Sequence, residues 1–313
     1  MVNENQTINV GIGFATGRKS FQRVLKTYAY NFMESGLTEQ KDVHLNVFVA
    51  YDLKYNNTQR SDYTNISQRV ATLIDNVYFI GNNTIQKDIC KLVSDGVIDK
   101  KSANILFSGG YAGKRNSVLF NAIKHGMDYL LFLDDDEYPL AVTHTRAYAV
   151  WSGQQVLSMH LNHIPDADIT NGYHCGYISP IPHIEYNDSF TETDFRTFIE
   201  AISNDILNWN NIKRVMERGG ITYADTNVLI SEDPINVLEQ KGAKFITGAN
   251  LCLNLTRPER VFPFYNPPNA RGEDTFLSTL LCNRTVLRVP AYTFHLYAYN
   301  GRGFTYQTIP HLL

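Results

Sequence analysis

The chain has 313 residues, a net charge of −3 and a hydrophobic fraction of 43%, values typical of a folded protein with one elaborate domain or two fused lobes. It has no block of Lys and Arg, so duplex nucleic acid is not expected as a partner and contact with a membrane is expected to be peripheral at most. The first residues are polar and acidic, and no segment has the ~20 apolar residues of a membrane helix. We therefore expect a cytoplasmic protein.

The first 140 residues alternate between the patterns of strands and helices. Apolar runs predict strands at 8–14, 43–50, 77–80, 105–107 and 129–133, and amphipathic patterns predict helices at 20–33, 85–93 and 114–125. Such alternation implies a mostly parallel sheet, which binds ligands at the carboxyl ends of its strands.

The pattern changes after Pro139. The sequence predicts one or two strands in 150–164, an irregular segment at 174–184, a helix at 194–217, a buried strand at 245–255 and a helix with an acidic first turn at 273–283. No repeat or linker interrupts the chain, so we expect one continuous domain with two lobes, residues 1–140 and 141–313.

Cysteines and most histidines show no metal-binding spacing. The four cysteines form no CxxC pair and are expected to be buried thiols: Cys90, Cys175, Cys252 and Cys282. Four histidines lack the tight spacing of zinc ligands, so no zinc site is expected at His160, His163, His174 and His183.

Three consecutive aspartates, Asp134, Asp135 and Asp136, follow the apolar run 129–133. Adjacent carboxylates repel one another and are costly at the end of a buried strand. A divalent cation is the usual compensation, and Mg²⁺ or Mn²⁺ held by one or two carboxylates commonly also binds substrate phosphates. The motif predicts a metal-bound, phosphorylated substrate, and a solvated acidic turn is the alternative.

Two cations, Lys114 and Arg115, stand at the start of the helix that precedes this strand. A helix start with two cations suits an anionic phosphate or the edge of a nucleotide. An exposed helix start is the alternative for both residues.

Together, these features resemble the GT-A glycosyltransferases, especially the inverting glycosyltransferase family two. The resemblance covers most of the chain and is carried by the Asp-x-Asp motif 134–136, by the segment Gly113-Lys114-Arg115-Asn116 and by the motif Arg271-Gly272-Glu273-Asp274-Thr275-Phe276. It implies a Rossmann-like α/β fold of the GT-A type, with a mixed, mostly parallel sheet flanked by helices. Residues 1–140 would bind the nucleotide-sugar, and residues 141–313 would bind the acceptor and supply the catalytic base.

The resemblance also implies a donor site. Asp134 and Asp135 would contact the sugar donor together with Lys114 and Arg115, and Mn²⁺ or Mg²⁺ would be held by Asp134, Asp136 and His295. His295 matches a late histidine that completes the metal site in many relatives; its imidazole suits Mn²⁺ better than Mg²⁺, although a histidine beside aromatic residues is often simply packed.

The loop after the first strand, 14–18, stands where the family has its nucleotide-binding loop, and only Thr16 and Arg18 match that loop. Asp52, after the second strand, matches an acid that contacts the base in relatives, or is a turn residue.

For the acceptor side, Asp274 resembles the aspartate that serves as catalytic base in inverting members, with Glu273 as second choice. Acids at a helix start are also explained by the helix dipole alone. The segment 246–250 resembles the strand and turn that border the acceptor site, so Gly248 and Asn250 are expected there. Trp209 and Tyr223 are candidate platforms on which a sugar could stack.

The sequence therefore predicts a hexosyltransferase that uses a UDP- or GDP-hexose and a carbohydrate or other hydroxyl acceptor, with inversion. A retaining glycosyltransferase, a sugar-phosphate nucleotidyltransferase and a binding module without catalysis are the alternatives.

Overall fold

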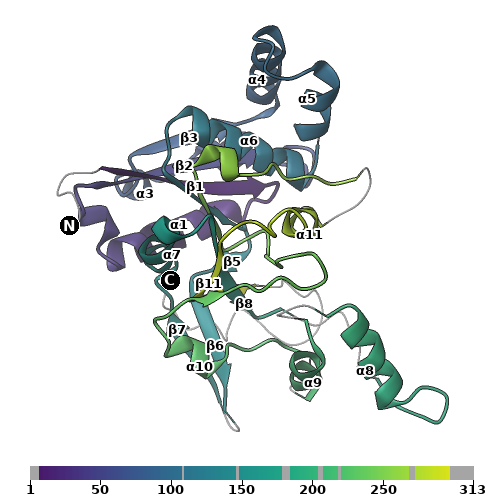
Figure 1. Cartoon of the computed structure of the whole chain (residues 1–313). Coiled ribbons are helices and arrows are strands. Elements are labelled where there is room, and N and C mark those ends of the chain that lie inside the picture. The colour runs from purple at the N-terminus through teal and green to yellow at the C-terminus, as the bar shows by residue number, and fades with distance from the viewer. Residues whose placement is uncertain are drawn as a thin grey trace.

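The computed structural model describes residues 7–107, 109–145, 148–177, 184–203, 207–217, 220–267 and 272–296. Its centre is a nine-stranded sheet with the strand order β3-β2-β1-β4-β10-β8-β11-β5, and β9 pairs with β11 beside this path (Figure 1). Within the described ranges, none of the helices combines the length and the apolar character that crossing a bilayer requires.

The strands of the large sheet come from both halves of the chain. They are β1 (Ile8–Thr16), β2 (Val43–Tyr51), β3 (Asn76–Ile80), β4 (Tyr129–Leu133), β5 (Glu137–Tyr138), β8 (Ile169–Cys175), β9 (Ile235–Asn236), β10 (Leu251–Asn254) and β11 (Val286–His295). Strands β3, β2, β1 and β4 are parallel, β10 is antiparallel to both of its neighbours, and β11 is parallel to β8. The expected mixed, mostly parallel α/β sheet is confirmed.

Strand β1 shows how the sequence builds the two faces of this sheet. Val10, Ile12 and Phe14 are fully buried on one face, while the alternate positions Gly11 and Gly13 face the other. A Cβ atom at Gly13 would lie 2.7 Å from Cγ1 of Val118 in α6 (Tyr111–Lys124). Glycine at this position therefore allows α6 to pack closely on the centre of the sheet.

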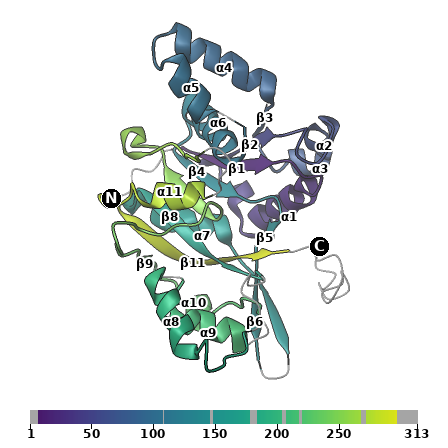
Figure 2. The same ribbon diagram turned by 90° about the vertical axis from the view of Figure 1, so that its right-hand side faces the viewer.

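Helices cover both faces of the sheet (Figure 2). One core is completed by α1 (Phe21–Glu34), α2 (Ser61–Thr64), α3 (Gln68–Ala71) and α7 (Val156–His163). The core on the opposite face is completed by α4 (Asn82–Ser94), α5 (Lys100–Leu106), α6 and α11 (Glu273–Ser278). Short 3-10 turns lie at η1 (Leu37–Glu39), η2 (Ile164–Asp166) and η3 (Pro258–Arg260).

A smaller part of the molecule lies below the large sheet in Figures 1 and 2. It contains the two-stranded sheet β6 (Leu140–His144) and β7 (Ala149–Gly153), and the helices α8 (Glu192–Ala201), α9 (Trp209–Glu217) and α10 (Thr226–Leu229). Helices α8 and α9 share a small core of their own, formed by Phe195, Ile199 and Trp209.

Several predicted elements are wrong. Residues 105–107 are not a strand, because Asp99 caps α5 by accepting hydrogen bonds from the amides of Lys101 and Ser102, and this helix continues to Leu106. An apolar run of three residues is too short to show a period of two or of 3.6.

The other differences concern the second half of the chain. Residues 150–164 contain the end of β7 and then α7, residues 194–217 contain two helices, the strand expected at 245–255 is limited to β10, and the helix expected at 273–283 ends at Ser278. The irregular segment expected at 174–184 begins with the end of β8, and residues 178–183 lie outside the described residues. All four cysteines are free thiols, but Cys90 is exposed and Cys282 is half-buried.

Candidate functional site

The predicted site residues follow the carboxyl ends of parallel strands. Thr16 ends β1, Asp52 follows β2, and the three aspartates follow β4. Strand β10 runs in the opposite direction, so the segment that leads into it, residues 246–250, reaches the same edge of the sheet. From β1, the next strands β2 and β3 lie on one side, whereas β4 lies on the other side of β1. Open α/β sheets bind ligands at such a switch point in the strand order.

Each of the three aspartates has different partners. Asp134 Oδ1 accepts a hydrogen bond from Arg115 Nη2 at 3.0 Å. Asp135 Oδ2 accepts one from Thr16 Oγ1 at 2.5 Å, and its Oδ1 accepts one from Arg18 Nη1 at 2.7 Å. The same Arg18 nitrogen donates to Asp136 Oδ2. The loop after β1 and the acids after β4 therefore form one cluster, as the sequence predicts.

Burial and charge crowding shift the pKa values in this cluster. Burial, together with Glu137, Asp136 and Asp135, raises the pKa of Asp134 to about 7, although Arg115 opposes the shift. Burial also raises the pKa of Asp135, against the effect of Arg18. Burial would lower the pKa of Arg18, but the two aspartates outweigh it and raise this pKa. Additional positive charge would relieve the repulsion among these carboxylates.

The donor atoms of Asp136 and His295 suit a divalent cation. Nε2 of His295 lies 3.4 Å from Oδ2 of Asp136, and two ligands of one small cation are about 3 Å apart when each bond is about 2.1 Å long. Asp134 lies against Arg115, and Oδ2 of Asp136 also accepts a hydrogen bond from Arg18. Among the residues that the structure describes, no three His, Cys, Asp or Glu side chains are grouped so that they could hold a metal ion. An ion bound here would therefore take its other ligands from substrate oxygens and water.

Lys114 lies at the ends of β2 and β3. Its Nζ is 3.7 Å from Oδ2 of Asp52 and 3.5 Å from Oδ1 of Asn82, at the start of α4. The lysine is almost fully buried, and burial lowers its pKa despite the nearby Asp52 carboxylate. Lys114 and Asp52 thus lie together at this edge of the sheet.

Arg115 links the donor side of the site to the acceptor side. Its guanidinium lies beside the packed rings of Phe132 and Phe264, with Cζ 5.5 Å and 5.7 Å from their centroids. Besides Asp134, it binds Oε1 of Glu273 through Nε at 3.4 Å and the carbonyl of Gly248 through Nη1. The side chain is buried, and these contacts give Arg115 a role in holding the site together as well as in charge balance. Its Nε forms an ion pair with Glu273 but makes no hydrogen bond.

The acidic pair that opens α11 is divided between two environments. Glu273 faces Arg115 and also accepts a hydrogen bond from Asn266 Nδ2 at 3.2 Å. Asp274 Oδ1 accepts a hydrogen bond from the amide of Thr275 at 2.8 Å. Glu273 is therefore the acid connected to the aspartate cluster, and Asp274 is the half-exposed neighbour.

The segment 246–250 contributes mainly through its backbone. Gly248 contacts Arg115, and a Cβ atom there would lie 3.0 Å from Nη2 of that arginine. Asn250 is fully buried with a φ of 50°, and its Nδ2 donates to the carbonyls of Tyr173 and Ala291. Its Oδ1 lies 2.8 Å from His160 Nε2. In this structure Asn250 therefore lies behind the edge of the sheet and shapes the turn, with no side-chain surface open to a sugar.

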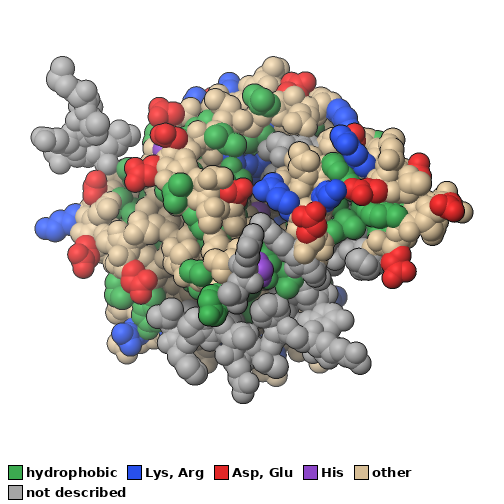
Figure 3. All heavy atoms as spheres, turned by 90° about the horizontal axis from the view of Figure 1, so that it is seen from below, with side chains coloured by type: hydrophobic (Ala, Val, Ile, Leu, Met, Phe, Trp, Pro, Cys, Tyr) green, Lys and Arg blue, Asp and Glu red, His purple; other side chains and the backbone are tan. Residues whose placement is uncertain are grey.

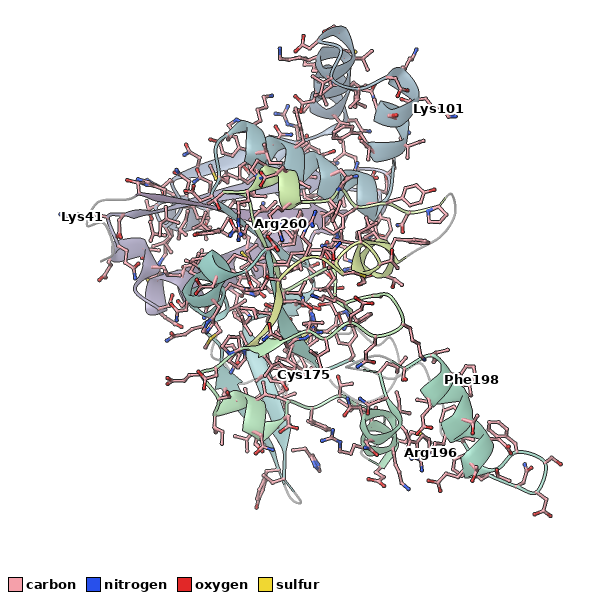
Figure 4. The ribbon with its side chains drawn as sticks, in the orientation of Figure 1. Lys41, Lys101, Cys175, Arg196, Phe198 and Arg260 are labelled. Carbon is pink, nitrogen blue, oxygen red and sulfur yellow. The ribbon has the colours of Figure 1, made fainter. Side chains whose placement is uncertain are left out.

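The two candidate stacking residues lie in the smaller part of the molecule. Trp209 is only 8% exposed and packs edge-on against Phe195, with centroids 6.0 Å apart. Figure 4 labels Phe198 and Arg196 on the adjoining α8, well away from Cys175 at the end of β8. Tyr223 packs against the ring of His144 at 4.9 Å. Trp209 thus belongs to a local core in this structure.

A buried carboxylate, Glu137, is a feature of the site that the sequence reasoning missed. It accepts hydrogen bonds from Tyr177 Oη and Thr293 Oγ1, each at 2.5 Å, and lies 3.0 Å from His174 Nδ1. Burial alone would raise the pKa of Glu137, but these three partners outweigh it and lower this pKa to about 2. The available signal was a fourth acid directly after the three aspartates.

His174 belongs to this cluster. Its Nε2 lies 2.7 Å from Oγ1 of Thr247, next to Gly248. His160 lies instead between Thr170 and Asn250, and His183 is outside the described residues.

On the face of the molecule seen from below, basic and acidic side chains lie side by side close to a histidine (Figure 3).

No protein-family model and no curated protein sequence matches this chain. Among solved structures, it is similar to mouse xyloside xylosyltransferase 1 in its apo form, with 11% identity, a TM-score of 0.30, and coverage of 80% of this chain and 69% of that one. It is also similar to the mannosyltransferase Ktr4p from S. cerevisiae in complex with GDP, with 8% identity, a TM-score of 0.28, and coverage of 88% of this chain and 61% of that one. Similarities at this level carry no argument about function.

Proposed function

We propose that this protein is a metal-dependent glycosyltransferase that moves a hexose from a UDP- or GDP-hexose to a glycan or other hydroxyl acceptor with inversion. The observation that supports this proposal is the cluster of Thr16, Arg18 and the three aspartates at the switch point between β1 and β4. A site with carboxylates and a cationic side chain at this edge of an α/β sheet suits a diphosphate that arrives with a divalent cation.

The donor nucleotide would lie over the ends of β1, β2 and β3. Lys114 and Asp52 are adjacent there, and they would bind the ribose or the base. Arg18 is about one-third exposed and lies beside the aspartates, where it would bind a phosphate oxygen.

Asp136 and His295 would hold Mn²⁺ or Mg²⁺, and their separation of 3.4 Å is compatible with a shared ion. When bound there, the cation would neutralise charge on the leaving nucleoside diphosphate. Asp134 and Asp135 would contribute through water or through the donor, and Arg18, which also contacts Oδ2 of Asp136 in this structure, would turn to a phosphate of the donor.

Asp274 would be the general base. It would take the proton of the acceptor hydroxyl as that oxygen bonds to the anomeric carbon, and the bond from this carbon to the diphosphate oxygen would break on the opposite face. Its position beside Glu273, which is tied to the aspartate cluster through Arg115, supports this assignment. An α-linked donor would then give a β-linked product.

A retaining transfer is the second candidate. The observation in its favour is that both acids of the α11 pair already have partners, Glu273 on Arg115 and Asp274 on its own helix. The anomeric configuration of the product, read by NMR, separates the two mechanisms.

The proposed function is tested by thermal unfolding of the protein with a panel of UDP- and GDP-hexoses, with and without Mn²⁺. A ligand that binds only the folded state raises the unfolding temperature. At 100 times its Kd, it adds about 2.7 kcal/mol to the free energy of unfolding. We expect a shift that requires both a nucleotide-sugar and Mn²⁺ and that is lost in Asp136→Asn. Absence of any shift across the panel contradicts the proposal.

A further inference from the structure

Tyr177 joins the buried carboxylate of Glu137 to the ring of His295. Its hydroxyl donates to Glu137 Oε1 at 2.5 Å, and its ring is stacked on the imidazole of His295 with centroids 4.2 Å apart and planes 12° apart. Tyr177 lies two residues after the end of β8, whereas His295 ends β11. The contact therefore joins two neighbouring strand ends at the candidate site.

Glu137 is a fixed anchor for this contact. Its side chain is fully buried and satisfied by Tyr177, Thr293 and His174. Its backbone pairs directly with that of His295 in the β5–β11 ladder, and the amide of Leu296 donates to the carbonyl of Asp136 at 3.0 Å. The backbone thus places His295 beside Asp136, and the side chain of Tyr177 sets the plane of its ring.

We propose that Glu137 and Tyr177 are positioning residues that hold the imidazole of His295 with Nε2 towards Asp136, ready to bind a divalent cation. This inference rests on the proposed metal site. Residues that orient a metal-binding histidine typically contribute 10- to 100-fold to metal affinity. Here the orientation comes from an aromatic ring anchored by a buried carboxylate.

The alternative is that Tyr177 only fills space between β8 and β11. The two roles differ in one respect that can be measured. A space-filling tyrosine would affect the stability of the fold, whereas a positioning tyrosine would affect metal affinity only as long as His295 is present.

The test is the affinity of the full chain for Mn²⁺, measured from the electron paramagnetic resonance signal of free Mn²⁺, first alone and then with UDP or GDP. We expect His295→Ala and Tyr177→Leu each to weaken binding at least about 10-fold. The double variant should bind no more weakly than His295→Ala. Tyr177→Phe keeps the stacked ring and loses the hydroxyl, so it should show a smaller loss, and Glu137→Gln should weaken binding in the same direction.

Tyr186→Leu is the matched control. Tyr186 is 36% exposed and Tyr177 is 37% exposed, and Tyr186 packs only against aromatic rings of the smaller part of the molecule among its described ring contacts. This variant should bind Mn²⁺ like the unaltered protein. If Tyr177→Leu is too unstable to purify, Tyr177→Phe and Glu137→Gln carry the test.

The outcomes separate this inference from the proposed function. Wild-type affinity in Tyr177→Leu, or in both Tyr177→Phe and Glu137→Gln, together with weak binding in His295→Ala, overturns the positioning role and leaves the metal site intact. If the double variant loses no more Mn²⁺ affinity than His295→Ala alone, the positioning role is supported. A wild-type chain that binds no Mn²⁺, alone or with either nucleotide, overturns the metal site and the positioning role together.

Discussion

Nη2 of Arg115 lies 3.0 Å from Oδ1 of Asp134, and the same guanidinium reaches Glu273 and the carbonyl of Gly248. One buried side chain therefore connects the acids after β4, the start of α11 and the turn before β10. Because these three segments are far apart in the sequence, the geometry of the site depends on this arginine.

The first prediction concerns Arg115→Met. Removing a buried cation leaves Asp134 close to the other acids without compensation, so the free energy of unfolding should fall by about 3 kcal/mol. Urea unfolding measures this change. Arg196→Met is the control, because Arg196 pairs with Glu200 on the exposed surface of α8, and its loss should cost less than about 1 kcal/mol. Equal effects of the two substitutions would show that Arg115 has no special role in stability.

The second prediction separates the two acids of α11. Asp274→Asn should lower kcat by about 10²- to 10⁴-fold, because a neutral amide cannot accept the acceptor's proton. Binding of the nucleotide-sugar should be unchanged. Glu273→Gln should instead lower stability, since Glu273 compensates Arg115. Full transfer activity in Asp274→Asn, measured with the donor found in the thermal panel, excludes this residue as the base.

The third prediction concerns Trp209, for which the sequence indicates sugar stacking and the structure shows a packed core. Trp209→Ala should destabilise the α8–α9 part by about 3 kcal/mol, as expected for loss of a large core side chain, and donor binding should be retained. Phe198→Ala is the control, because Phe198 is 57% exposed on the same pair of helices. A raised KM for the acceptor with unchanged stability would favour the stacking role instead.

The fourth prediction is a pH dependence that arises at His160. Burial lowers the pKa of His160 from 6.5 to about 4, so the folded state favours the neutral ring. The resulting contribution to the free energy of unfolding is fully present above pH 6.5. It is lost as the pH falls towards 4, and the total loss is about 3 kcal/mol. His160→Gln should be less stable than the unaltered protein at pH 7, and the difference in unfolding free energy should shrink by about this amount at pH 4. A difference that does not change with pH refutes the assignment.

Local sequence patterns were sufficient for the long strands and helices of the first half of the fold, but they missed α5 and the short helices α2 and α3. Strands β1, β2 and β4 are apolar runs of more than four residues, and α1 shows a clear helical period, so their positions agree with the predictions. The cluster of Thr16, Arg18 and the aspartates also follows from sequence, because parallel strands bring their carboxyl ends to one edge.

The remaining parts depend on contacts that a single sequence does not contain. Whether Arg115 faces a ligand or Glu273 is decided by where α11 packs, and α11 lies over 150 residues later in the chain. The role of Glu137 depends on its hydrogen bonds with Tyr177, which follows β8, and with Thr293 of β11. In the second half, capping residues and packing decided between strand and helix in runs where periodicity was ambiguous.

The direction of β10 has a consequence for how such a protein can diversify. Its residues pair with Phe132 and Leu131 of β4 on one side and with Asn171 and Thr170 of β8 on the other. A slip by one residue would turn its side chains to the opposite face and would shift the turn before it relative to Asp134. Inherited insertions and deletions should therefore accumulate in α8, α9 and the β6–β7 hairpin. The four-residue strand Leu251–Asn254 should keep its length, so new specificities would arise while the position of the turn before β10 stays fixed.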